Sequence, residues 1–267
     1  AQALEPATWI PITKASKVVL AGDPFQLPPT VKLHQARKEG LEVTLLEKMI
    51  ARLPQVNLLT TQYRMHENIM GFSNEQFYEG ELIADESVGQ HQLDIGNEAA
   101  FVFVDTAGCG FEEKMNEQFK SRYNPEEFMI LREHLYQLVD DYAAMELLEM
   151  IPPIALISPY REQVVYMKKA IEEDEKIASL PMTINTIDGF QGQERDIVYI
   201  TLVRSNSKGE IGFLNDFRRM NVALTRARKL LVVVGDSATI GGQTFYSDLL
   251  EYVDKNGQYQ TGWEYMA

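Results

Sequence analysis

The sequence predicts an α/β protein with a mostly parallel sheet, because short apolar runs rich in β-branched residues alternate with longer helical patterns. Strands that alternate with helices of about ten or more residues form crossover units, in which neighbouring strands run in the same direction. The predicted strands cover residues 17–21, 56–60, 101–105, 154–158, 182–186, 197–203 and 230–235. Such sheets bind ligands beyond the carboxyl ends of their strands, so we expect the functional loops there.

The predicted helices follow these strands along the chain. They cover residues 41–52, 67–77, 125–144, 161–174, 213–226 and 245–254. The third helix has the clearest start signal, because the side chain of Asn124 can cap it and Pro125 suits its first position. Residues 79–97 show no clear period and predict a surface loop.

Composition indicates a globular protein without membrane spans. The chain has 267 residues, and a hydrophobic content of 45% can fill a sizeable core. Cys109 is the single cysteine, which excludes an internal disulfide framework, and the longest apolar runs are far too short to cross a bilayer. We therefore expect a reducing, cytoplasmic setting and no membrane partner.

The net charge of −14 does not favour a nucleic-acid partner, but the charge is unevenly distributed. Residues 204–229 hold seven Lys or Arg against two acidic residues, whereas residues 112–149 hold ten acidic residues against four basic ones. A local cationic site on an acidic protein is therefore physically reasonable.

The segment of residues 218–228 concentrates guanidinium groups, with the sequence Arg-Arg-Met-Asn-Val-Ala-Leu-Thr-Arg-Ala-Arg. Helical spacing predicts that Arg219, Val222 and Arg226 share one face, from which fixed cations could project toward an anion. Planar, permanently charged donors suit the oxygens of a transferring phosphoryl group. An arginine run by itself is more typical of a solvated basic helix, so the other motifs decide between the two interpretations.

Five blocks occur in a defined order along the chain: residues 22–29 (Gly-Asp-Pro-Phe-Gln-Leu-Pro-Pro), 62–66 (Gln-Tyr-Arg-Met-His), 158–163 (Ser-Pro-Tyr-Arg-Glu-Gln), 185–194 (Asn-Thr-Ile-Asp-Gly-Phe-Gln-Gly-Gln-Glu) and 221–228 (Asn-Val-Ala-Leu-Thr-Arg-Ala-Arg). In residues and in order they resemble the later motifs of superfamily 1 helicases. Gln-Tyr-Arg-Met-His is similar to the group that contains the RNA helicase of nonsense-mediated decay and its DNA-acting relatives. The resemblance runs from residue 1 to about residue 236 and is specific, because five independent motifs keep their order.

The resemblance implies an ATP-driven motor with two RecA-like lobes. Gln26 resembles the glutamine that senses the γ-phosphate and links it to strand binding, and Asp23 resembles a member of the same loop. Arg64 and Arg226 resemble the two arginines that reach the γ-phosphate from the second lobe. Because these arginines would face a phosphate site on the other lobe, hydrolysis would require the lobes to close.

Further residues match positions that bind the nucleotide base, its ribose and the nucleic acid. Tyr63 would lie against the adenine, and Glu194 would bond the ribose with Gln191 nearby. The positions that match contacts with the backbone of single-stranded DNA or RNA are Ser158, Tyr160 and Thr186.

The sequence contains no Gly-x-x-x-x-Gly-Lys-Ser/Thr loop for the phosphates of ATP. Its first residues resemble those just after the Asp-Glu-Ala motif of the family, so we expect a C-terminal part of a helicase. Residues 1–54 would complete the first RecA-like lobe (the motif III region), and residues 55–267 would form the second lobe (motifs IV to VI). ATP and Mg²⁺ would then be bound mainly by the upstream lobe, the second partner besides the strand, and the isolated chain would lack ATPase activity.

Several residues have a structural interpretation beside the functional one. Tyr63 could be a core aromatic, His66 is more typical of a structural histidine than of a ligand, and Asp188 could cap a turn. Salt bridges are the more ordinary role for Arg218, Arg219 and Arg228.

Two other functions remain open at this stage. The first is a nucleic-acid-binding or regulatory module that keeps the helicase fold without hydrolysis. The second is an unrelated doubly wound enzyme such as a dehydrogenase, which is disfavoured because no Gly-x-Gly-x-x-Gly follows a predicted strand. The choice between DNA and RNA is not encoded by these motifs, because their contacts go to phosphate and sugar.

Overall fold

The computed structural model describes residues 2–31, 33–54, 56–96 and 99–266. The chain divides into two compact units, Ala1–Leu59 and Thr60–Ala267, which are described separately. The assignment of residues 1–54 and 55–267 to two helicase lobes stays a prediction.

The described residues of the first unit form three short helices: α1 (Glu5–Ile12), α2 (His34–Lys38) and α3 (Leu45–Ile50). The helix predicted over residues 41–52 is shorter than expected, because Thr44 caps α3 in a reciprocal capping box with Glu47. Residues 17–21 and 56–60, all of them described, form none of the predicted strand. A strand needs a hydrogen-bonded neighbouring strand, and none within the described part of the chain pairs with either segment, although the carbonyl of Thr60 accepts the N–H of Ile83 at 2.8 Å.

The second unit is built on a six-stranded sheet with the order β10-β3-β9-β8-β6-β7. Every neighbouring pair in this sheet is parallel. Its strands are β3 (Phe101–Asp105), β6 (Ile154–Ser158), β7 (Met182–Thr186), β8 (Arg195–Thr201), β9 (Ala227–Gly235) and β10 (Gln258–Thr261). The predicted α/β fold with a parallel, RecA-like sheet is confirmed.

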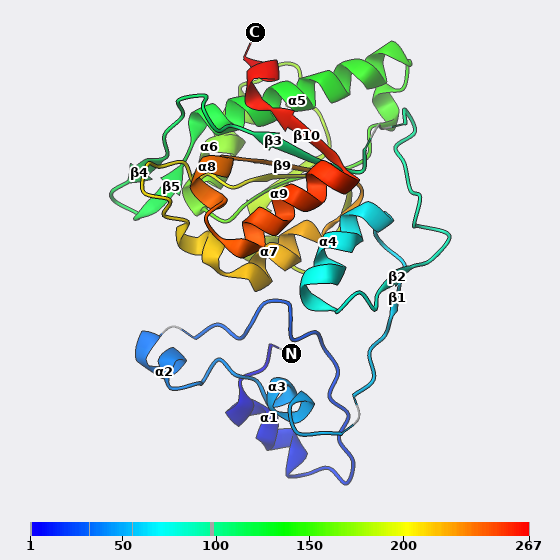
Figure 1. Ribbon diagram of the computed structural model, residues 1–267, viewed down its shortest axis with the longest axis vertical. Helices are drawn as coiled ribbons and strands as arrows, with labels where there is room; N and C mark the ends of the chain where they lie inside the picture. The colour runs from blue at the N-terminus through cyan, green and yellow to red at the C-terminus, as the bar shows by residue number, and fades with distance from the viewer. Residues whose placement is uncertain (1, 32, 55, 97–98, 267) are drawn as a thin grey trace. The chain divides into compact units, whose positions relative to one another are not determined.

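Helices cover both faces of this sheet. They are α4 (Glu67–Phe77), α5 (Pro125–Ala144), α6 (Arg161–Glu172), α7 (Phe217–Leu224), α8 (Ser237–Ile240) and α9 (Thr244–Asn256). Apolar residues of α5 and α6 form one core with every second residue of the strands, such as Val232 and Val234 in β9. Figure 1 shows α4, α7 and α9 on the side of the sheet opposite to α5. The inner strands β3, β6, β8 and β9 are therefore largely buried on both faces and are rich in apolar residues, whereas the outer strands β7 and β10 are more polar and more exposed.

Four 3₁₀ helices and two small sheets complete the second unit. The 3₁₀ helices are η1 (Leu148–Met150), η2 (Asp188–Phe190), η3 (Gly212–Asn215) and η4 (Gly262–Tyr265). The small sheets pair β1 (Thr61–Gln62) with β2 (Ile83–Ala84), and β4 (Lys114–Asn116) with β5 (Ser121–Tyr123). Within the described ranges, no helix combines the length and apolar character needed to cross a bilayer.

Candidate nucleotide and nucleic-acid interface

Arg64 and Arg226 converge on one residue, although they come from distant parts of the chain. Arg64 follows β1, and its Nη1 donates to the backbone carbonyl of Thr225 at 3.2 Å. Arg226 donates through Nη2 to the hydroxyl of the same Thr225 at 3.1 Å. The fold thus brings the two predicted γ-phosphate arginines to two different groups of Thr225, its carbonyl and its hydroxyl.

The segment before β8 supplies the acceptors that complete this cluster. The Nε of Arg64 donates to the carboxylate of Glu194, and both side chains are partly exposed. The Nη1 of Arg226 donates to the carbonyl of Gln193 at 3.3 Å, and its Nε donates to the carbonyl of Val222 at 2.8 Å. Arg226 is only 3% exposed, so its guanidinium is held by the protein at a fixed position.

This cluster lies at the amino ends of the strands, and the expectation of carboxyl ends is wrong for it. Glu194 directly precedes β8 and Arg226 directly precedes β9, and Arg195 donates its backbone N–H to the carbonyl of Arg226. The helix predicted over residues 213–226 is also wrong in extent. Helix α7 ends at Leu224, so Arg226 leaves the helical face on which spacing had grouped it with Arg219.

Two further arginines of this segment, Arg219 and Arg228, form ion pairs. The Nε of Arg219 lies 3.3 Å from Asp188, and its Nη1 lies 3.3 Å from Asp216. Arg228 lies 3.4 Å from Asp196. The salt-bridge interpretation is therefore confirmed for Arg219 and Arg228, and Asp188 acts as a partner for Arg219.

His66 has a structural role in the fold, whereas Tyr63 is exposed to solvent. His66 caps α4, because its Nδ1 accepts the backbone N–H of Asn68 at 3.1 Å, and burial lowers its pKa. The structural interpretation of His66 is thus confirmed. Tyr63 is 67% exposed beside Arg64, which excludes a core role, and Gln191 is half-buried directly after η2.

The predicted nucleic-acid residues gather at the opposite edge of the sheet. Ser158 and Thr186 are register partners at the carboxyl ends of β6 and β7. Ser158 is fully buried and its Oγ accepts the backbone N–H of Tyr160 at 3.2 Å. Thr186 is half-buried and its Oγ1 accepts the N–H of Gly189 at 3.2 Å. Tyr160 is also buried, at 3% exposure.

A buried carboxyl group supports this edge from within the protein. Glu127, on α5, accepts hydrogen bonds from the hydroxyl of Thr201 and from the N–H of Val203 at 2.8 Å. Val203 has φ = 72°, a left-handed conformation that is strained for a β-branched residue. Burial raises the pKa of Glu127 to about 8, so the group favours its neutral form.

Asp23 and Gln26 lie in the first unit. The side chain of Gln26 donates from Nε2 to Asp23 at 2.9 Å, and Asp23 also accepts the N–H of Phe25 at 2.9 Å. The loop therefore holds both predicted side chains together within its own unit.

Several contributors carried no usable signal in the sequence. Thr225 and Gln193 lie inside recognised blocks, but the carbonyls that accept hydrogen bonds from Arg64 and Arg226 are common to every residue, and only the hydroxyl of Thr225 adds a side-chain contact. Glu113 pairs with Arg204 at 2.7 Å across 91 residues of chain, and no local pattern announces this pair.

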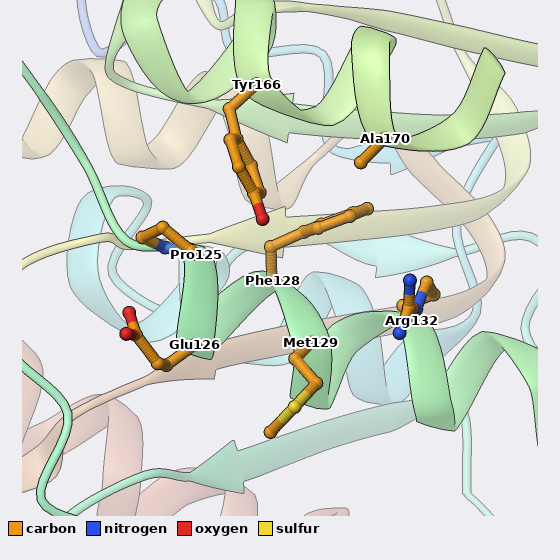
Figure 2. A pocket seen from close by; sticks show the side chains of 7 residues that line it. All are labelled: Pro125, Glu126, Phe128, Met129, Arg132, Tyr166 and Ala170. Atoms are coloured by element: carbon orange, nitrogen blue, oxygen red, sulfur yellow. The ribbon is translucent and has the colours of Figure 1, made fainter. Parts of the chain in front are cut away.

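A surface pocket of about 260 Å³ lies between α5 and α6 (Figure 2). Its lining residues are Pro125, Glu126, Phe128, Met129, Arg132, Tyr166 and Ala170. No predicted site residue belongs to this lining. Among the described residues there is also no group of three or more His, Cys, Asp or Glu side chains that could hold a metal ion.

Family models match most of the chain. A model described as an AAA domain matches residues 41–238, and a second model with the same description matches residues 1–33.

Curated relatives match the chain over nearly its whole length. DNA-binding protein SMUBP-2 of Mesocricetus auratus is 40% identical over 100% of this chain and 27% of its own length. DNA polymerase alpha-associated DNA helicase A of Saccharomyces cerevisiae is 36% identical over 96% of this chain and 40% of its own. Probable helicase MAGATAMA 3 of Arabidopsis thaliana is 36% identical over 97% of this chain and 32% of its own length. The chain thus spans less than half of each of these relatives.

A solved structure, described as the C-terminal domain of a possible DNA helicase from Lactobacillus, aligns with 75% of this chain and 99% of its own. The sequence identity is 12% and the TM-score is 0.37. With so low a score, the fold assignment depends on the sheet of this chain itself.

Proposed function

We propose that this chain, which belongs to the superfamily 1 helicases and within them to the group of the nonsense-mediated-decay helicase, supplies arginine fingers and strand contacts to an ATP-driven motor. The intact protein would hydrolyse ATP and move along single-stranded DNA or RNA. The chain by itself would lack ATPase activity, because its sequence has no glycine-rich phosphate loop.

The observation that supports this proposal most directly is the convergence of Arg64 and Arg226 on Thr225. Two guanidinium groups from separate blocks are held next to Glu194, the residue proposed to bond the ribose. A solvated basic helix would give no reason for such a fixed, partly buried arrangement.

The arrangement suits phosphoryl transfer. ATP, when bound, supplies the phosphoanhydride bond that is cleaved, and the transferring group spreads negative charge over its oxygens. Arg64 and Arg226 would stabilise that charge when the lobes close, as cations that are already ordered before the reaction. Such arginines contribute on the order of 10³ to 10⁵ in rate in other nucleotide hydrolases.

The remaining candidates would orient the nucleotide. Tyr63 is exposed beside Arg64, so its ring is accessible to the adenine. Glu194 and Gln191 would bind the ribose, and Gln26 with Asp23 would sense the γ-phosphate. Mg²⁺ and the phosphates would be held mainly by an upstream lobe.

The strand would bind at the carboxyl edge of the sheet, near Ser158, Tyr160 and Thr186. Because Ser158 and Tyr160 are buried, neighbouring exposed groups would make much of the direct contact. The contacts proposed here go to phosphate, sugar and base faces, which DNA and RNA share.

The test is an ATPase assay of the intact protein with single-stranded DNA, with single-stranded RNA and without nucleic acid, in parallel with the 267-residue chain. We expect hydrolysis that a single strand stimulates in the intact protein, and none in the chain alone. Strand binding without hydrolysis in the intact protein would instead favour a regulatory binding module. Robust turnover by the chain alone would contradict the proposed division of labour.

A further inference from the structure

Phe213 presents its ring to solvent at the edge where the strand contacts are predicted. It lies in η3 and is 60% exposed. A single exposed ring is ordinary on a protein surface. What distinguishes Phe213 is its surroundings, in which buried side chains hold the ring beside the predicted strand contacts.

The ring of Tyr160 packs against the exposed ring of Phe213. The two ring centroids lie 5.4 Å apart, and the hydroxyl of Tyr160 accepts the backbone N–H of Phe213 at 3.3 Å. Tyr160 is 3% exposed, so it serves as a buried support for a neighbour that is open to solvent. Of these two rings, only that of Phe213 is accessible to a ligand.

The buried ion pair of Arg204 and Glu113 fixes the position of Tyr160. Arg204 donates from Nη1 to the hydroxyl of Tyr160 at 3.5 Å, and from Nε to the carboxylate of Glu113 at 2.7 Å. Arg204 and Glu113 have side chains that are 3% and 6% exposed. The orientation of Tyr160, and with it that of Phe213, is therefore set by groups shielded from solvent.

The backbone of Gly212 lies close to the side chains of Arg204 and Tyr160. Its φ is +55°, and a Cβ added there would lie 2.1 Å from Nη1 of Arg204 and 2.9 Å from the hydroxyl of Tyr160. A side chain at this position would push η3 away from Tyr160. The backbone thus reaches its position before Phe213 only with glycine.

The platform lies within the predicted strand interface. Tyr160 follows Ser158, the last residue of β6, by two positions, and Ser158 pairs with Thr186. Arg161 comes directly after Tyr160, begins α6 and is exposed, which places a cation beside the aromatic support. Exposed aromatics next to cations are the combination with which proteins bind single strands.

We propose that Phe213 is a stacking platform for one base of the bound single strand, and that Tyr160 acts on the strand through Phe213. This inference rests on the proposed function and deepens it by naming the residue that meets a base. A π-face stacks on any base, so the contact adds affinity without sequence preference.

Affinity of the intact protein for a single-stranded oligonucleotide is the first measurement. Phe213→Ala is expected to weaken binding about tenfold, the ordinary cost of losing one aromatic stack. Phe213→Trp is expected to bind within about twofold of the natural protein. Phe213→Leu keeps an apolar side chain but has no ring to stack on a base, so it should lose nearly as much affinity as Phe213→Ala. The dependence of affinity on salt should stay the same in all three variants, because no phosphate contact is removed.

Phe119→Ala is the matched control, because Phe119 is equally exposed, at 63%, in the turn between β4 and β5. It is expected to bind like the natural protein. Photo-cross-linking with oligonucleotides that carry 5-iodouracil is expected to attach one base to Phe213, as located by mass spectrometry of the tryptic peptides.

The outcomes separate the two proposals. If the natural protein binds no single strand, the proposed function fails and the stacking proposal fails with it. If it binds, but Phe213→Ala matches Phe119→Ala and no cross-link reaches Phe213, only the stacking proposal is overturned. Full affinity in Phe213→Leu would also overturn stacking, because apolar cover alone would then suffice.

Discussion

At the scale of single residues, Arg64 and Arg226 carry the first prediction. We expect Arg64→Ala and Arg226→Ala in the intact protein each to lower strand-stimulated ATPase activity on the order of 10³-fold, because each removes a cation from the developing phosphate charge. Affinity for the strand should change less than about threefold, since both arginines lie at the other edge of the sheet. Steady-state kinetics and equilibrium binding measure the two effects.

Arg228→Ala is the control for these variants. It removes a guanidinium from the same segment, but one that pairs with Asp196. Its ATPase activity should stay within about fivefold of the natural value, as an exposed ion pair contributes little. Equal losses of hydrolysis and strand binding in Arg226→Ala would count against the finger role.

Glu194 carries the second prediction, because its carboxylate faces both Arg64 and the proposed ribose site. Glu194→Gln is expected to raise KM for ATP about tenfold, the effect of losing one charged hydrogen bond, with a smaller change in kcat. The variant should also distinguish ATP from 2′-deoxy-ATP less well than the natural protein. A fall in kcat with unchanged KM would instead indicate that Glu194 serves only to position Arg64.

Glu127 carries a prediction about pH, because its raised pKa of about 8 links protonation to folding. Between pH 4.5 and 8 the folded chain keeps a proton that the unfolded chain releases, so stability falls as pH rises through this range. The slope from this group is at most about 1.4 kcal/mol per pH unit. Glu127→Gln should flatten it in urea denaturation at several pH values, whereas the exposed Glu149→Gln should retain it. An unchanged slope in Glu127→Gln would contradict the raised pKa.

At the scale of elements, Asn124 joins the start of α5 to the carboxyl end of β8. Its Oδ1 accepts the N–H of Glu127 at 3.0 Å and its Nδ2 donates to the carbonyl of Val203 at 3.2 Å. Asn124→Ala should therefore lose a helix cap and leave a buried carbonyl unpaired, at a cost of about 2–4 kcal/mol in the free energy of unfolding. Asn116→Ala, at the last residue of β4, removes only an exposed hydrogen bond to the N–H of Gln118 and should cost less than about 1 kcal/mol. Chemical denaturation measures both, and equal losses would refute the role of Asn124.

The predicted ranges 67–77 and 125–144 agree with α4 and α5 to the residue. The sequence indicates the cap of α5, Asn124, whereas the role of His66 as the cap of α4 is seen only in the structure. The single helix predicted over residues 213–226 is wrong, because Asp216 caps a new helix and divides the segment into η3 and α7. Residues 17–21 have a strand pattern, yet Val19 is 80% exposed, since a strand forms only with a partner.

The candidate site divides in the same way. The motif blocks identified which side chains to consider, because residue type and order carry that information. They could not place Arg226 at the amino ends of the strands or pack the buried Tyr160 against Phe213, because these facts depend on where α7 ends and on how η3 packs. Long-range pairs such as Glu113 with Arg204 leave no trace in local sequence.

At the scale of the second unit, the parallel sheet separates two tasks. The arginine cluster precedes β8 and β9, whereas Phe213 and Tyr160 lie by the carboxyl end of β6. A seven-residue strand such as β8 spans about 20 Å, so the two sites lie well beyond direct contact. The buried strands between them form a rigid connection, because both of their faces are packed.

This separation predicts independent effects in a double variant of the intact protein. Phe213→Ala should raise the strand concentration that gives half-maximal ATPase stimulation about tenfold without changing kcat. Arg226→Lys should lower kcat and leave that concentration unchanged, because a single ammonium replaces the planar donor fork without touching the strand. Sites so far apart behave additively in free energy, so the double variant should show each change in full. The ratio of kcat to the half-maximal strand concentration should then fall by the product of the two single effects. A departure of more than about threefold from that product would contradict the independence of the arginine cluster and the stacking platform.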